Sequence, residues 1–150
     1  MSGGGKEYLD DALKKAVAPQ ALALVICDLV LRDEKSHNVS LVGLFNAILA
    51  GRFPARHDRM HVFVSLTHGH GKIPCRLECT GPDDKVIFRL DGHVEFKNPL
   101  GVIDANFELR GVVFPTPGPY VLELSCAGVP VIARRFEVLE SKSQGEKGKE

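Results

Sequence analysis

The sequence predicts an all-β protein, an immunoglobulin-like antiparallel β-sandwich of about seven to eight strands. Several stretches alternate apolar and polar residues with a period of two, which is typical of strands with one buried face. Clusters of Gly, Pro and Asp separate these stretches, and no long helical pattern interrupts them. A partly open barrel is the alternative architecture.

The first element is a short helix expected over residues 6–17. Leu9, Leu13 and Val17 recur at helical spacing, and two aspartates precede two lysines, as a helix dipole prefers. Pro19 would stop such a helix. A helix of this length is not stable alone, so it must dock on its own sandwich or on a partner.

Residues 21–31 and 39–49 form the next pair of strands and are apolar on both faces. This pattern predicts a central hairpin, or strands covered on their second face by the N-terminal helix or by a partner. Asp28 interrupts the first strand and must find hydrogen-bond donors or a wet face. Gly43 indicates a bulge or a close backbone approach in the second.

Five further strands alternate regularly, and each is expected to bury one face. Their predicted inward residues are Met60, Val62, Val64 and Leu66; Ile73, Cys75, Leu77 and Cys79; Val86, Phe88 and Leu90; Ile103, Ala105, Phe107 and Leu109; and Tyr120, Leu122, Leu124 and Cys126. The tight turn at Pro117–Gly118 leads into Tyr120, whose hydroxyl can tie back to nearby backbone, as in sandwich corners.

The chain divides into a lead-in at residues 1–19, a sandwich domain at 20–140 and a charged, disordered tail at 141–150. Nineteen basic residues balance nineteen acidic ones, which argues against a nucleic-acid partner. The N-terminus lacks the pattern of a secretory signal, and no apolar stretch is long enough to span a bilayer. We therefore expect a cytoplasmic protein with no membrane contact.

Four cysteines are present, and in the absence of an export signal they are expected to be reduced thiols. Cys75 and Cys79 lie four residues apart along a predicted strand. At strand spacing they are roughly 13 Å apart. A disulfide needs Cα atoms within about 7 Å, so this pair cannot bridge without a bend.

The histidines are the candidate metal ligands. His68 and His70 lie two residues apart and could chelate Zn²⁺ or Cu²⁺, with His57, Asp58 or His61 as a third ligand. The competing interpretation places residues 68–70 in a solvated loop with a turn glycine, and it is favoured. Cys75 and Cys79 could join such a zinc site, but their alternation with polar residues favours the core.

No catalytic signature accompanies these residues, so the sequence predicts a protein that is not an enzyme and carries no cofactor. One of Arg134 and Arg135 must face inward or lie at an edge, and the pair could bind a partner's carboxylate. A small-ligand or sugar-binding sandwich is disfavoured because Trp is absent and the tyrosines are limited to Tyr8 and Tyr120.

Four segments carry a family resemblance: residues 23–30 (ALVICDLV), 39–46 (VSLVGLFN), 53–57 (FPARH) and 114–120 (FPTPGPY). Together they resemble a family of small uncharacterised bacterial proteins, a domain of unknown function expected to fold as a β-sandwich. The resemblance covers roughly residues 21–139. It implies a fold and brings no activity, cofactor or site residue.

The expected function is a non-catalytic binding or scaffolding module that acts through protein–protein contacts. The doubly apolar hairpin at residues 21–50 is the candidate interface, with a second copy or another protein as partner and a homodimer as one form. The alternatives are a metal-binding protein or metal-dependent enzyme using His57, His61, His68 and His70, and a small-ligand or sugar-binding sandwich.

Overall fold

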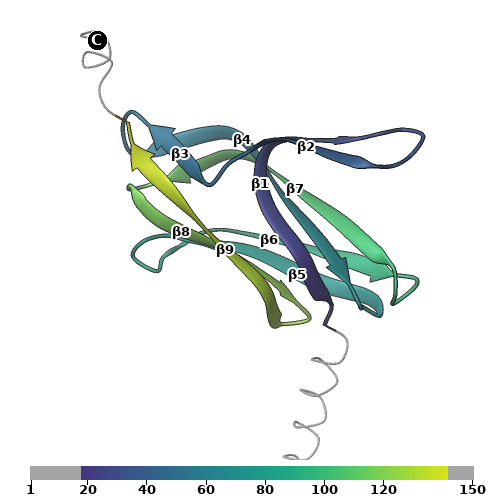
Figure 1. Cartoon of the computed structure of the whole chain (residues 1–150). Coiled ribbons are helices and arrows are strands. Elements are labelled where there is room, and N and C mark those ends of the chain that lie inside the picture. The colour runs from purple at the N-terminus through teal and green to yellow at the C-terminus, as the bar shows by residue number, and fades with distance from the viewer. Residues whose placement is uncertain (1–17, 142–150) are drawn as a thin grey trace, which may run out of the picture.

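A computed structural model describes residues 18–141, which form nine strands arranged as two facing sheets (Figure 1). The strands are β1 (Gln20–Arg32), β2 (Val39–Leu44), β3 (Ala47–Ala50), β4 (Ala55–Thr67), β5 (Gly71–Thr80), β6 (Val86–Phe96), β7 (Val102–Phe114), β8 (Gly118–Cys126) and β9 (Val129–Glu140). The expected helix at 6–17 and residues 142–150 of the expected tail lie outside the described residues.

The two sheets are separate, which confirms a β-sandwich over the alternative of a barrel. One sheet has the strand order β2-β1-β4-β7, and the other has the order β3-β9-β8-β5-β6. Neighbouring strands are antiparallel except for β3, which runs parallel to β9. Within residues 18–141 no helix is long and apolar enough to cross a membrane.

The strand expected over residues 39–49 is in fact two strands, which is why the count is nine. The chain leaves β2 after Leu44, passes through Phe45 and Asn46, and enters β3 in the opposite sheet. The predicted central hairpin is therefore wrong in one respect. β1 is an interior strand, but β2 and β3 each form the edge of a different sheet.

The core lies between the two sheets and matches the alternation in most strands. Each predicted inward residue of β4, β5 and β8 is buried. Val86 of β6 is an exception because it is 41% exposed near the start of an edge strand. β6 instead buries Val94 and Phe96 near its other end. Leu109 is the buried residue among the predicted set of β7.

An aromatic cluster closes one end of this core. The ring of Tyr120 is fully buried, 5.0 Å from the Phe114 centroid and 5.8 Å from the Phe136 centroid. Its hydroxyl donates a hydrogen bond to the Thr116 carbonyl oxygen at 2.6 Å. The predicted tie from this tyrosine to nearby backbone is confirmed.

Candidate functional site

The hairpin of β1 and β2 extends beyond the sandwich as a two-stranded arm, defined here as residues 28–43. The pairing of β1 with β4 ends at Cys27, opposite His61, whereas the pairing with β2 continues to Arg32. Figure 1 shows the hairpin projecting away from both sheets. An isolated hairpin is only marginally stable in water, so a surface that covers an arm of this kind would stabilise it.

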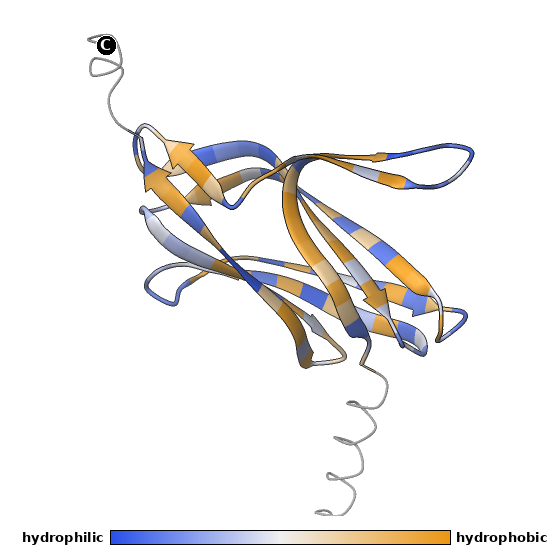
Figure 2. Ribbon diagram, in the orientation of Figure 1, coloured by the Kyte–Doolittle hydropathy of each residue, from blue (hydrophilic) through white to orange (hydrophobic). Residues whose placement is uncertain are grey.

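One face of the arm and its base carries a row of apolar side chains, three of them exposed, which we name the apolar strip. Leu29 lies opposite Val42 and Leu31 lies opposite Ser40, so their side chains share a face, on which Leu44 follows Val42 by two residues. Leu31 is 49% exposed, Val42 46% and Leu44 61%. Figure 2 shows hydrophobic residues along the strands of the hairpin and hydrophilic ones at its tip. The strip comprises Val25, Leu29, Leu31, Val42, Leu44 and Phe63.

The strip continues from the arm onto the outer face of the four-stranded sheet. Val25 pairs with Phe63 of β4, on the face opposite the buried Leu24 and Ile26. Phe63 is 8% exposed although it lies on this outer face. Cys27, between Val25 and Leu29 on this face, is fully buried, so the exposed part of the strip is at Leu31, Val42 and Leu44.

The opposite face of the arm is also apolar, which confirms the two-sided pattern. Val30 lies opposite Leu41, and both are half-buried. Asp28 interrupts this face and is exposed to water, which is one of the two environments expected for it. Its carboxylate lies over Gly43, where an added Cβ would come within 2.3 Å of Oδ2. The predicted close approach at Gly43 is confirmed, and its φ of +71° also favours glycine.

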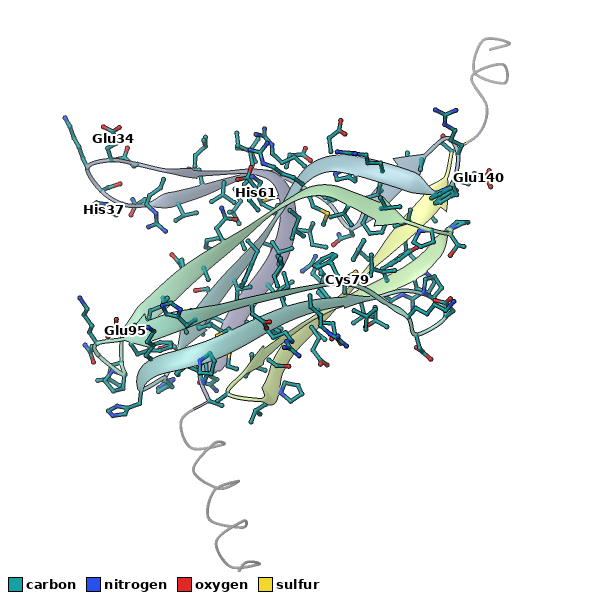
Figure 3. The ribbon with its side chains drawn as sticks, turned by 180° about the vertical axis from the view of Figure 1, so that it is seen from behind. Glu34, His37, His61, Cys79, Glu95 and Glu140 are labelled. Carbon is teal, nitrogen blue, oxygen red and sulfur yellow. The ribbon has the colours of Figure 1, made fainter. Side chains whose placement is uncertain are left out.

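The tip of the arm is held by local hydrogen bonds. Oδ1 of Asp33 accepts from the backbone N–H groups of Lys35 and Ser36, each at 2.8 Å. Arg32 Nη1 donates to the carbonyl oxygen of His37 at 3.0 Å. Figure 3 labels Glu34 and His37 at this tip, far from the core. The arm therefore presents the apolar strip on an ordered hairpin.

Arg134 joins the two sheets where the chain passes from β2 to β3. It pairs in register with the buried Leu122, so it faces inward, as expected for one of the two arginines. Nη1 donates to the Leu24 carbonyl oxygen at 3.0 Å, and Nη2 donates to Oδ1 of Asn46. Arg135 faces outward and pairs with Glu137 at 2.7 Å. Both guanidinium groups therefore have partners within the chain, and neither is positioned to bind a partner's carboxylate.

The candidate metal ligands are not brought together. His57 and His61 lie on β4, whereas His68 and His70 lie in or beside the turn after its far end. Both residues of the turn motif are exposed, and His68 has a φ of 60°. Among residues 18–141 no group of three or more His, Cys, Asp or Glu side chains could hold a metal ion. The loop interpretation is therefore favoured over chelation.

Sequence reasoning missed a cysteine, histidine and asparagine that lie on three adjacent strands. His61 lies opposite Cys27 in register, and its Nδ1 is 3.1 Å from Oδ1 of Asn106. The Cys27 thiol does not engage the imidazole, because it donates to the Leu29 carbonyl oxygen at 3.5 Å. Burial raises the pKa of this thiol. A catalytic thiol needs a lowered pKa and access to substrate, so this arrangement is not that of an activated nucleophile.

The structure pairs Cys75 with Cys126 rather than with Cys79. Cys75 lies directly opposite Cys126 on β8, and the two sulfur atoms are 3.1 Å apart. Cys79 is fully buried on the same face of β5, and burial raises its pKa to about 12. All four cysteines are free, buried thiols. The spacing of Cys75 and Cys79 rules out a bond between those two residues but does not reveal the contact of Cys75 with Cys126. The reason is that Cys126 lies 51 residues away in the chain.

A charged hollow lies on the outer face of β5, β6 and β8. It has a volume of ≈ 470 Å³, and most of its charges are already neutralised. Arg76 pairs with Asp91 at 2.7 Å, and Glu78 pairs with Arg89. Tyr120, the one tyrosine within the described residues, is fully buried and offers no aromatic platform for a sugar.

Fold and surface together define a two-sheet β-sandwich domain with a projecting apolar arm. The chain belongs to a family of unknown function, DUF6941, whose model matches residues 22–139. This match confirms the resemblance of residues 21–139 to a family of unknown function. No curated protein matches the chain.

Solved structures with a similar fold share little sequence with this chain. The C-terminal domain of Wzt has a TM-score of 0.48 at 7% identity, over 84% of this chain and 75% of that one. An immunoglobulin-like protein from Pseudomonas aeruginosa has a TM-score of 0.38 at 9% identity, over 80% and 95%. The alkylpurine DNA glycosylase AlkC from Pseudomonas fluorescens has a TM-score of 0.41 at 11% identity. The match covers 62% of this chain and 27% of the glycosylase, so it spans about a quarter of that enzyme.

Proposed function

We propose that this protein is a non-catalytic binding module whose docking surface is the apolar strip, and that a second copy of the chain is its partner. The observation that carries the proposal is the exposure of Leu31, Val42 and Leu44 on one face of a projecting hairpin. Contiguous exposed apolar surface on a soluble domain typically marks an interaction site, whereas scattered apolar residues do not.

The position of β2 favours self-association. β2 is an edge strand, so the backbone groups on its outer side are not paired with another strand of its sheet. Two copies can align these edges antiparallel about a two-fold axis, which is the commonest symmetry of homodimers. In such a pair the two strips lie side by side on one face of a joined sheet, so that Val42 and Leu44 of each β2 can contact their counterparts across the seam.

The balanced charge of the chain and the position of its surface ion pairs are compatible with a protein partner. The chain has equal numbers of basic and acidic residues, so its surface does not favour a polyanion. The ion pairs Arg76–Asp91 and Arg135–Glu137 lie on the five-stranded sheet, away from the apolar strip. Desolvation of the strip therefore leaves these pairs in water.

Light scattering on a size-exclusion column tests the proposal with the full chain over a range of concentrations. Leu44→Glu places a charge in the centre of the docking surface and should convert the dimer into a monomer. Leu100→Glu is the matched control, because Leu100 is 78% exposed in the β6–β7 turn, outside the strip. This control should elute with the wild type. A wild-type monomer at every concentration, or a dimer that Leu44→Glu leaves intact, overturns the proposal.

A further inference from the structure

We propose that Cys75 and Cys126 are a modification site, a thiol pair that a hydroperoxide such as hydrogen peroxide converts into a disulfide. The pair is separate from the docking surface of the proposed function. The two cysteines lie on strands that are adjacent in the sheet, although they are 51 residues apart in the chain. Of the four cysteines, these two alone have their sulfur atoms within hydrogen-bonding distance of each other.

The register of the sheet places the pair within reach of a covalent bond. Cys75 of β5 and Cys126 of β8 are direct partners in an antiparallel ladder. Direct partners have Cα atoms about 4.5–5.5 Å apart, which lies inside the range of about 4.4–6.8 Å found for disulfides. The sulfur atoms, now 3.1 Å apart, need to approach by about 1 Å to reach a bond length of about 2.05 Å. Side-chain rotation supplies a movement of that size without a shift of either strand.

The surroundings distinguish the two thiols. The hydrogen bond from Cys126 lowers the pKa of the Cys75 thiol, burial acts in the opposite direction, and the backbone of Val94 adds a second lowering contact. The same hydrogen bond, with burial, raises the pKa of Cys126. Cys75 is therefore the sulfur that ionises first, and Cys126 is the one that keeps its proton. Cys75 also retains 5% exposure, whereas Cys126 has none.

The pair lies at one end of the sandwich, where local opening is easiest. Cys126 is the last residue of β8 and is followed by a turn in which Ala127 and Gly128 have φ of 52° and 77°. Ala127 N–H donates to the Pro74 carbonyl oxygen at 2.8 Å, so this turn covers the residue before Cys75. Fraying at strand ends costs less free energy than opening in mid-sheet, which gives a small oxidant a route.

The chemistry balances in two steps. The Cys75 thiolate attacks one peroxide oxygen and breaks the O–O bond, which leaves a sulfenic acid on Cys75 and releases the other oxygen as water after it takes up a proton. The Cys126 sulfur then attacks the sulfenic sulfur, the S–S bond forms, and the hydroxyl leaves with the Cys126 proton as a second water. Two thiols lose two electrons and two protons, and one peroxide becomes two waters.

Peptide mapping by mass spectrometry tests the site on the folded full chain after exposure to hydrogen peroxide, with unreacted thiols alkylated. The expected product is one peptide pair linked through Cys75 and Cys126, with the chain lighter by two hydrogens and restored by a dithiol reductant. Its urea unfolding midpoint should exceed that of the reduced protein, because the link closes a long loop. Four free thiols after treatment, or a link to Cys27 or Cys79, overturns the proposal.

Matched variants separate the pair from general thiol oxidation. Cys126→Ala should abolish the internal link and leave Cys75 as a sulfenic acid that a dimedone probe captures. Cys79→Ala is the control, because Cys79 is a buried cysteine on the same face of β5 with no sulfur neighbour, and it should link as the wild type does. If Cys126→Ala does not fold, the wild-type peptide map decides alone.

Discussion

Arg134 donates a hydrogen bond to Asn46, a residue 88 positions earlier in the chain, and so joins β9 to the short segment between β2 and β3. The same guanidinium donates to the Leu24 carbonyl oxygen of β1 at 3.0 Å. One side chain thus links one sheet to the other at the point where the chain crosses between them. This is also the base of the projecting arm, so Arg134 and Asn46 help to set the direction in which the apolar strip points.

Replacement of Arg134 by methionine should lower the free energy of unfolding by about 1–2 kcal/mol. The substitution keeps most of the aliphatic stem but leaves the Leu24 carbonyl oxygen and the Asn46 amide without their donor. Urea denaturation monitored by circular dichroism measures the change. Arg135→Met on the same strand is the control, because its exposed pair with Glu137 contributes little. Equal effects of the two substitutions would contradict the assigned role of Arg134.

Removal of the Tyr120 hydroxyl tests the corner at the end of the core. Tyr120→Phe keeps the ring between Phe114 and Phe136 but removes the 2.6 Å hydrogen bond to the Thr116 carbonyl oxygen. We expect a loss of about 1 kcal/mol in the same unfolding experiment. Thr116→Ala should be nearly neutral, since the bond uses the backbone of Thr116 rather than its side chain. A larger loss in Thr116→Ala than in Tyr120→Phe would show that the bond is not the source of stability.

Sequence patterning predicted the fold best where a strand buries one face. β5 and β8 alternate strictly, and their inward residues could be named in advance because period-two alternation reports burial directly. The stretch from Val39 to Leu49 is apolar on both faces, so alternation carried no sign of the break at Phe45 and Asn46. The sheet change there depends on partners in β9, which local sequence does not encode.

The same limit applies to the candidate sites. The doubly apolar hairpin was visible as a pattern, but its exposure as an arm depends on where β4 stops pairing with β1. The contact between Cys75 and Cys126 depends on the register of two strands that are distant in sequence. By contrast, His68 and His70 were prominent only because they are close in sequence, and the turn that holds them provides no further ligands.

Gly43 tests whether the base of the arm needs its unusual backbone. Gly43→Ala should cost about 1–2 kcal/mol, because its φ of +71° is disfavoured for alanine. The new Cβ would also lie 2.3 Å from Oδ2 of Asp28, which must then move. Gly128→Ala shares the positive φ of 77° but meets nothing within 4 Å, so it should cost less. Gly92→Ala has neither feature and should change stability by less than about 0.5 kcal/mol.

Acidification should loosen the tip of the arm before the sandwich unfolds. The N–H groups of Ser36 and Lys35 donate to Asp33 and lower the pKa of its carboxyl group below the ordinary value of 3.8. A lowered pKa in the folded state means that the carboxylate stabilises the turn fully above pH 3.8, and that this contribution is lost as the pH falls through the folded pKa. The amide chemical shifts of Lys35 and Ser36, followed by NMR during an acid titration, should therefore change with a midpoint below 3.8.

Asp33→Asn should remove that transition, whereas Asp83→Asn, in the β5–β6 turn, should leave it in place. A midpoint at or above 3.8 would contradict the hydrogen bonds assigned to Asp33 and, with them, the ordered tip that presents the apolar strip.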